Sequence, residues 1–140
     1  MIIKENLIEQ YPLTEKAESE YECYKVAPRK YVIFLDDTIS HSDTEALLDK
    51  IATSTKTSSF VVNLFVVVAN TNEKFKPEDL VFFNGEDTFV VYYLLNSNNG
   101  EIYFNDQRVF WFSVDWKKII KKFNHILKGD NGYVHYLSTF

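Results

Sequence analysis

The stretch from residue 58 to residue 70, SSFVVNLFVVVAN, most constrains what this chain can fold into. It is apolar on both alternating faces, rich in β-branched residues, and bounded at each end by small polar residues. This pattern is typical of a strand that is buried on both sides. It is shorter than the roughly 20 residues that cross a bilayer as a helix, and Asn63 interrupts it. We therefore expect it to form the central strand of a sheet.

The length and composition predict one compact domain over residues 1–140. Apolar residues make up 46% of the chain, and only 4 Gly and 3 Pro offer places to turn loosely. The net charge of -5 disfavours binding to nucleic acid or to an anionic membrane. The sequence from Met1 to Asn6 has neither the basic start nor the apolar run of a signal peptide. We therefore expect a cytoplasmic protein without a membrane span.

The first half of the chain predicts an alternation of helices and strands. In order, we expect a helix over 3–11, a strand ending at Pro28, a strand over 31–35 and a helix over 43–52. Ser42 and Glu45 have the spacing of a capping box, which predicts where the second helix begins. The order strand, helix, strand is compatible with a parallel crossover and with an antiparallel arrangement.

The second half of the chain predicts a β-meander followed by a helix. Short apolar strands separated by Asn- and Gly-containing turns are expected over 80–83, 88–95, 101–104 and 108–112. An apolar stripe through Phe123 predicts a final helix that Ser113 caps and Gly129 ends. Residues 133–137 predict a short edge strand. The fold class is therefore α+β, with a mostly antiparallel sheet and two to three helices packed on it.

Residues 32–39, VIFLDDTI, and residues 66–72, VVVANTN, resemble two motifs of the haloacid-dehalogenase-like phosphatases. This resemblance implies phosphoryl transfer through a nucleophilic aspartate and Mg²⁺ at the end of the first strand. However, aligning the Leu-Asp-Asp-Thr stretch puts Phe34 at the position of the nucleophile, and a phenyl ring cannot attack phosphorus. We interpret Asp36 and Asp37 as solvated carboxylates at the end of a strand.

The remaining chemically active side chains do not form a recognisable catalytic or metal-binding pattern. Cys23 is the single cysteine, so the sequence excludes an internal disulfide and predicts a small buried side chain. His41, His125 and His135 lack the spacing of metal ligands and are expected at the surface. We therefore expect no catalytic residue, no metal and no cofactor, and a protein that is not an enzyme.

Two features of the second half predict a surface that binds a partner. The final helix carries a patch of lysines opposite its apolar stripe, interpreted as a solvated face or as a contact for an acidic partner. The strands over 88–95 and 108–112 are apolar on both faces, so either the N-terminal segment or another chain must cover the second face. The candidate partner-binding residues are Tyr92, Tyr93, Phe110, Trp111, Lys117 and Lys121.

The functional expectation is a small acidic non-enzymatic binding protein of bacterial or phage type. Residues 87–128 combine a strand, a Gly-containing turn, an EIYF strand and a helix with Phe123 near its middle. This order is similar to that of a family of immunity proteins. We expect an immunity or anti-defence inhibitor that occludes a partner protein, and the alternative is a structural subunit or adaptor of a larger assembly. The partner is a protein or a second copy of the chain, which the sequence does not identify.

Overall fold

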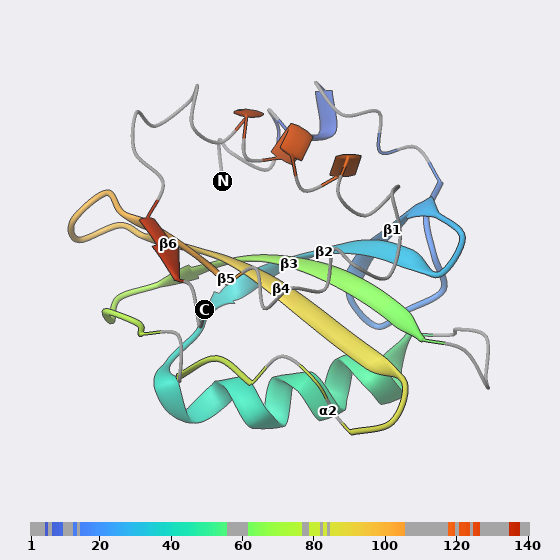
Figure 1. The fold of residues 1–140 in the computed structure, drawn as a ribbon, viewed down its shortest axis with the longest axis horizontal. Helices are drawn as coiled ribbons and strands as arrows, with labels where there is room; N and C mark the ends of the chain where they lie inside the picture. Colours follow the sequence, from blue (N-terminus) through green and yellow to red (C-terminus); the bar gives the residue numbers. More distant parts are fainter. Residues whose placement is uncertain are drawn as a thin grey trace.

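The computed structural model of the chain has three layers, with one sheet between two layers of helices (Figure 1). The structure describes residues 5, 7–9, 13, 15–55, 62–76, 79–81, 83, 85–105, 118–119, 121–123, 125–126 and 135–137. Helix α2 (Thr44–Ser54) lies on one face of the sheet. The described helical residues near the two ends of the chain, 5, 7–9, 118–119, 121–123 and 125–126, lie on the opposite face (Figure 1).

The sheet has six described strands, and their spatial order follows the chain. They are β1 (Glu22–Ala27), β2 (Lys30–Thr38), β3 (Asn63–Thr71), β4 (Thr88–Asn96), β5 (Ile102–Asn105) and β6 (His135–Leu137). Strands β2, β3 and β4 are parallel, and β6 is parallel to β5. Only the β1–β2 and β4–β5 pairs are antiparallel. The sheet of this α+β fold is therefore mixed, and the prediction of a mostly antiparallel sheet is wrong.

The described residues do not confirm the predicted meander, whose first strand was expected over 80–83. Residues 80 and 81 are not in a strand, and Phe83 makes only an isolated bridge to Phe89. The connection instead packs Phe75 and Leu80 on the α2 side of the sheet, so that β4 runs in the same direction as β3. The β4–β5 hairpin is antiparallel as expected. The strand expected over 108–112 lies outside the described residues.

The central strand is confirmed as β3. It is hydrogen-bonded to β2 on one side and to β4 on the other, and its side chains from Asn63 to Ala69 are buried. The segment from β2 through α2 to β3 is a parallel crossover, which decides between the two arrangements that the sequence left open. Parallel strands end at the same edge of a sheet, so the carboxyl ends of β2 and β3 lie side by side.

The crossover helix begins differently from the prediction. A single 3-10 turn, η1 (His41–Asp43), precedes α2, and the capping pair is Ser40 with Asp43 instead of Ser42 with Glu45. The Asp43 carboxylate accepts hydrogen bonds from the Ser40 amide at 2.8 Å and from the Ser40 hydroxyl at 2.7 Å. This pairing anchors the helix directly at the end of β2.

Alternate side chains along the strands belong to two separate hydrophobic clusters, one on each face of the sheet. On the α2 side, Leu47, Leu48 and Ile51 pack against the strands. On the other side, Leu7 and Leu13 of the N-terminal segment pack together with three residues of the C-terminal helix, Ile119, Phe123 and Ile126. The N-terminal segment therefore covers the second face, which was one of the two alternatives that the sequence left open.

The described part of the C-terminal helix has the predicted amphipathic pattern. Ile119, Phe123 and Ile126 are buried, whereas Lys118 and Lys121 are exposed. Strand β6 confirms the short edge strand, although residues 133 and 134 lie outside the described part. Among the helices that the structure describes, none is long and apolar enough to cross a membrane.

Candidate functional site

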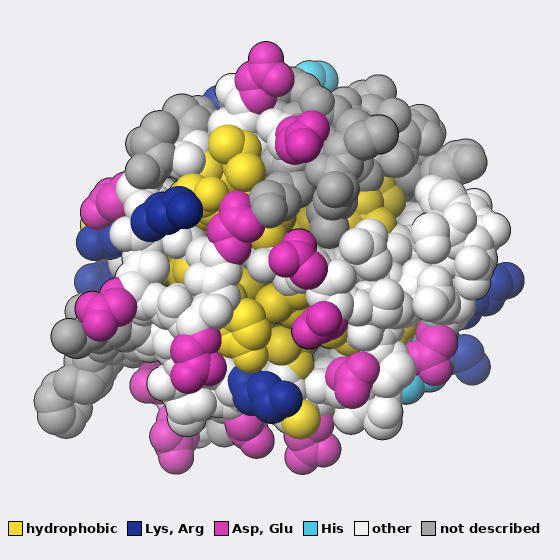
Figure 2. All heavy atoms as spheres, turned by 180° about the vertical axis from the view of Figure 1, so that it is seen from behind, with side chains coloured by type: hydrophobic (Ala, Val, Ile, Leu, Met, Phe, Trp, Pro, Cys, Tyr) yellow, Lys and Arg dark blue, Asp and Glu magenta, His cyan; other side chains and the backbone are white. Residues whose placement is uncertain are grey.

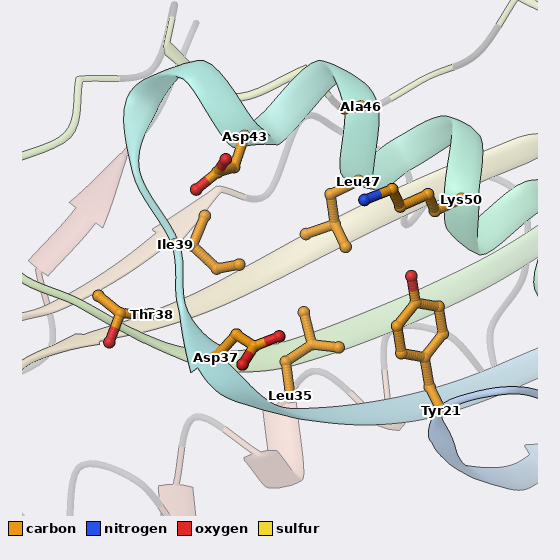
Figure 3. Close-up of a pocket in the computed structure, with 9 residues that line it drawn as sticks. All are labelled: Tyr21, Leu35, Asp37, Thr38, Ile39, Asp43, Ala46, Leu47 and Lys50. Atoms are coloured by element: carbon orange, nitrogen blue, oxygen red, sulfur yellow. The ribbon is translucent and has the colours of Figure 1, made fainter.

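A pocket of about 190 Å³ opens between α2 and the carboxyl-terminal end of β2 (Figure 3). We call it the α2–β2 pocket. Its polar lining residues are Tyr21, Asp37, Thr38, Asp43 and Lys50. Its apolar lining residues are Leu35, Ile39, Ala46 and Leu47. The pocket thus combines a hydrophobic floor with side chains of both charges.

The periodicities of the strand and the helix place these residues together. Leu35 and Asp37 are two residues apart on β2, so both side chains point to the α2 side of the sheet. Asp43 at the start of α2, and Ala46 and Lys50 on it, follow the spacing of one helical face. The small side chain of Ala46 lies between the two charged residues in this spacing.

Tyr21 reaches the pocket from a distant part of the chain, because the segment before β1 is fastened to the end of α2. The hydroxyls of Ser19 and Thr55 are 2.8 Å apart, and the Glu20 amide donates to the Ser54 carbonyl at 3.4 Å. The Tyr21 amide in turn donates to the Ser19 hydroxyl at 3.1 Å. As a result the Tyr21 hydroxyl points toward α2, across the pocket from Asp37 (Figure 3).

Charges of both signs act on the titratable groups that line the pocket. Burial raises the pKa of the Tyr21 phenol, and the negative charges of Glu20 and Asp37 raise it further. The hydrogen bonds from Ser40 hold the pKa of Asp43 below its ordinary value, and the positive charge of Lys50 adds to this effect. Within the described part of the chain, no hydrogen bond or ion pair engages the Asp37 carboxylate, which is exposed and faces the pocket (Figure 3).

A second polar cluster, around His41, lies beside the pocket and has a structural role. The His41 Nε2–H donates to the Lys74 carbonyl, and the His41 amide donates to the Glu73 carboxylate at 2.8 Å. The His41 ring also packs edge-on against Phe75, with 4.3 Å between ring centroids. These contacts fasten η1 to the connection after β3. Among the described residues, no three His, Cys, Asp or Glu side chains lie where they could hold a metal ion.

The structure brings together the two motifs that resemble those of the phosphatases, but without a nucleophile. Phe34 is 3% exposed and points into the hydrophobic cluster on the face opposite α2. At the end of β3 the Thr71 hydroxyl donates to the Ile39 carbonyl at 2.7 Å and accepts from the Glu73 amide at 3.1 Å. Thr71 thus ties two strand ends together, and Phe34 fills the core.

Cys23 also has the environment that the sequence predicted. Its side chain is 2% exposed and belongs to the hydrophobic cluster on the α2 side. Burial raises the pKa of the Cys23 thiol to about 12. Because the thiolate is the reactive form of cysteine, this thiol is protonated and unreactive at neutral pH.

The predicted partner-binding residues do not form one surface. Tyr92 and Tyr93 are each 0% exposed, one in each hydrophobic cluster, so the expectation that they contact a partner is corrected. The Tyr92 hydroxyl donates to the Val81 carbonyl at 3.0 Å, and the Tyr93 ring stacks on Phe104. Lys121 is exposed on the C-terminal helix. Phe110, Trp111 and Lys117 lie outside the described residues.

The sequence interpretation missed the α2–β2 pocket. The spacing of Asp43, Ala46 and Lys50 was a readable signal for one helical face, and Asp37 was interpreted only as a solvated carboxylate. No sequence signal connected Tyr21 with these residues, because their contact depends on the bridge between residues 19 and 55.

No family model matches the chain, and comparisons with curated proteins and with solved structures find no match. The resemblances to phosphatases and to immunity proteins therefore rest on the quoted residues alone. Support for a function comes from the geometry and the charge of the pocket and its surroundings.

Proposed function

We propose that this protein is a small acidic non-enzymatic binding protein that occludes a partner protein, as an immunity protein or an anti-defence inhibitor does. The observation that carries the proposal is the distribution of surface charge. On the face shown in Figure 2, acidic side chains, with some Lys or Arg side chains among them, lie around hydrophobic side chains that are visible at the surface. Apolar surface inside a charged rim is the usual composition of a protein–protein contact, and the acidic rim favours a basic partner.

The positions of the most reactive side chains also support a binding role over catalysis. Phe34 replaces the nucleophile of the phosphatase motif, and the Cys23 thiol is buried and protonated. The His41 ring is held by the Lys74 carbonyl and by Phe75. Each of these groups is used to hold the fold together.

Affinity capture from the cells that encode the protein tests this proposal. We expect one basic protein to be captured in a fixed ratio. The purified pair should bind with an affinity that falls as salt rises, because charge attraction between the surfaces is screened. Calorimetry on the pair at two salt concentrations measures the affinity, and an activity assay of the partner measures its inhibition. Capture as a fixed member of a large assembly without inhibition would favour the adaptor alternative.

A phosphatase assay gives a separate prediction. The purified protein with Mg²⁺ should not hydrolyse p-nitrophenyl phosphate, because the buried Phe34 ring occupies the position of the nucleophile. Replacing the exposed Asp36 with alanine should leave this baseline unchanged. Hydrolysis that is lost in the Asp36→Ala variant would show that this carboxylate is catalytic and would contradict a non-enzymatic role.

A further inference from the structure

The size and lining of the α2–β2 pocket fit a single side chain better than a whole small molecule. Its volume of about 190 Å³ is below the roughly 300–1,000 Å³ that is common for small-molecule sites. Leu35, Ile39 and Leu47 form an apolar floor, and the charged groups stand at its edges (Figure 3). A side chain with a long apolar stem and a polar head matches this division.

The charges at the pocket select a cationic head group. Asp43 and Asp37 provide two carboxylates against one ammonium group, that of Lys50. The positive charge of Lys50 acts on Asp43, which leaves Asp37 as the carboxylate that faces the pocket and has no hydrogen bond or ion pair among the described residues. Glu20 adds negative charge next to Tyr21.

We infer that the α2–β2 pocket receives an arginine side chain from the partner protein, an inference that rests on the proposed binding function. The apolar stem of the arginine lies on Leu35 and Leu47. Its guanidinium group donates hydrogen bonds to Asp37, for which a planar fork of donors and a carboxylate are matched in geometry. The ring of Tyr21 at the pocket wall offers a surface on which a guanidinium group stacks.

The charge of Lys50 distinguishes an arginine side chain from the alternative occupants of the pocket. It is the cation of the pocket lining, so it repels an incoming guanidinium group and attracts a carboxylate. If the occupant is an arginine side chain, removing the charge of Lys50 strengthens binding. If the occupant is an anion or a free amino acid, whose carboxylate needs a cation, removing that charge weakens binding. The sign of one variant therefore separates these classes of ligand.

The test is an NMR titration of the isotope-labelled full-length protein with N-acetyl-arginine amide, which presents the side chain without charged termini. We expect chemical-shift changes at the amides of residues 37–39 and 43–50. Asp37→Asn should weaken binding by about tenfold, because it removes the charged acceptor. Lys50→Gln should strengthen binding by about threefold, because it removes a nearby like charge. N-acetyl-citrulline amide, which is uncharged and similar in shape, should cause no localised change.

Asp36→Asn is the matched control for Asp37→Asn. Asp36 is the adjacent exposed aspartate on β2, and it does not line the pocket. The control should bind the arginine probe with unchanged affinity. Equal weakening by both variants, or weaker binding in Lys50→Gln, would overturn the inference.

The same variants separate the pocket from the proposed function. If Asp37→Asn binds the captured partner as tightly as the wild type, the partner uses another surface, so the pocket inference is wrong and the binding function stands. If no partner inhibition is found while the arginine probe binds as described, the pocket stands and the proposed function is wrong.

Discussion

Replacing Phe123 with alanine is expected to lower the free energy of unfolding by about 3–5 kcal/mol, the usual cost of removing a buried aromatic ring. Phe123 is 0% exposed and belongs to the hydrophobic cluster on the face opposite α2. Its ring lies against Tyr93, with 6.3 Å between ring centroids. The substitution removes the contact between the Phe123 and Tyr93 rings and leaves a cavity between the helix and the sheet. Chemical unfolding followed by circular dichroism measures the effect.

Lys121→Ala is the control for this prediction, because Lys121 lies two residues earlier on the same helix and is exposed. We expect it to change the free energy of unfolding by no more than about 0.5 kcal/mol. The comparison separates loss of packing from a general effect on the helix. If Phe123→Ala were as stable as Lys121→Ala, the helix would not be packed on the sheet in solution.

The elements that the sequence predicted best are those whose pattern depends only on neighbours along the chain. The run around Val66 and Val67 is apolar on both faces, and the structure makes it a central strand. The helix after Ser40 has an apolar stripe through Leu47 and Ile51. The predicted capping pair, Ser42 with Glu45, lies two residues after the observed pair, Ser40 with Asp43. Both pairs have the spacing of a capping box, and local spacing does not choose between them.

The direction of β4 shows where local pattern was misinterpreted. Residues 88–95 are apolar on both faces, and this was interpreted as surplus surface on an antiparallel meander. A continuous apolar strand is also typical of a parallel sheet that is covered on both sides. That second interpretation is the correct one, because Tyr92 packs under α2 and Tyr93 under the C-terminal helix. The coverage depends on Leu7 and Phe123, which are far apart in the sequence.

The α2–β2 pocket could not be predicted from the sequence, because it too depends on contacts between residues that are far apart in the chain. Its floor comes from a strand and a helix that were both predicted, but its wall at Tyr21 depends on the contact between Ser19 and Thr55. Contacts of this kind follow from the tertiary fold, and a single sequence carries no periodic signal for them. The charges on Asp37 and Lys50 were visible in the sequence, whereas their position around one pocket was not.

Raising the pH above about 9 is expected to destabilise the protein steeply, and Cys23 is the first cause. Burial raises the pKa of the folded-state thiol from 9.0 to about 12. Between these values the unfolded chain loses this proton and the folded chain keeps it, so alkaline pH favours the unfolded state. The contribution of the protonated Cys23 thiol to the free energy of unfolding is therefore complete below pH 9. Above pH 9 this contribution falls by about 1.4 kcal/mol for each further pH unit, until the pKa of the folded state is reached.

Tyrosines extend the effect to higher pH. Burial raises the pKa of Tyr92 and of Tyr31 above the ordinary value of 10.0, so above pH 10 each adds to the loss of stability in the same direction.

Urea unfolding at pH 8, 9, 10 and 10.5 measures how steeply the free energy of unfolding falls with pH. The Cys23→Ala variant should start from a lower stability, because a small cavity forms, but should lose less stability than the wild type between pH 9 and 10. Tyr92→Phe should keep the wild-type slope of unfolding free energy against pH between pH 9 and 10. Above pH 10 its slope should be flatter than that of the wild type, since the Tyr92 hydroxyl that it lacks ionises in the unfolded chain only from about pH 10. Identical slopes for the wild type and Cys23→Ala would mean that the thiol ionises as readily in the folded protein as in the unfolded chain, and that β1 does not bury it.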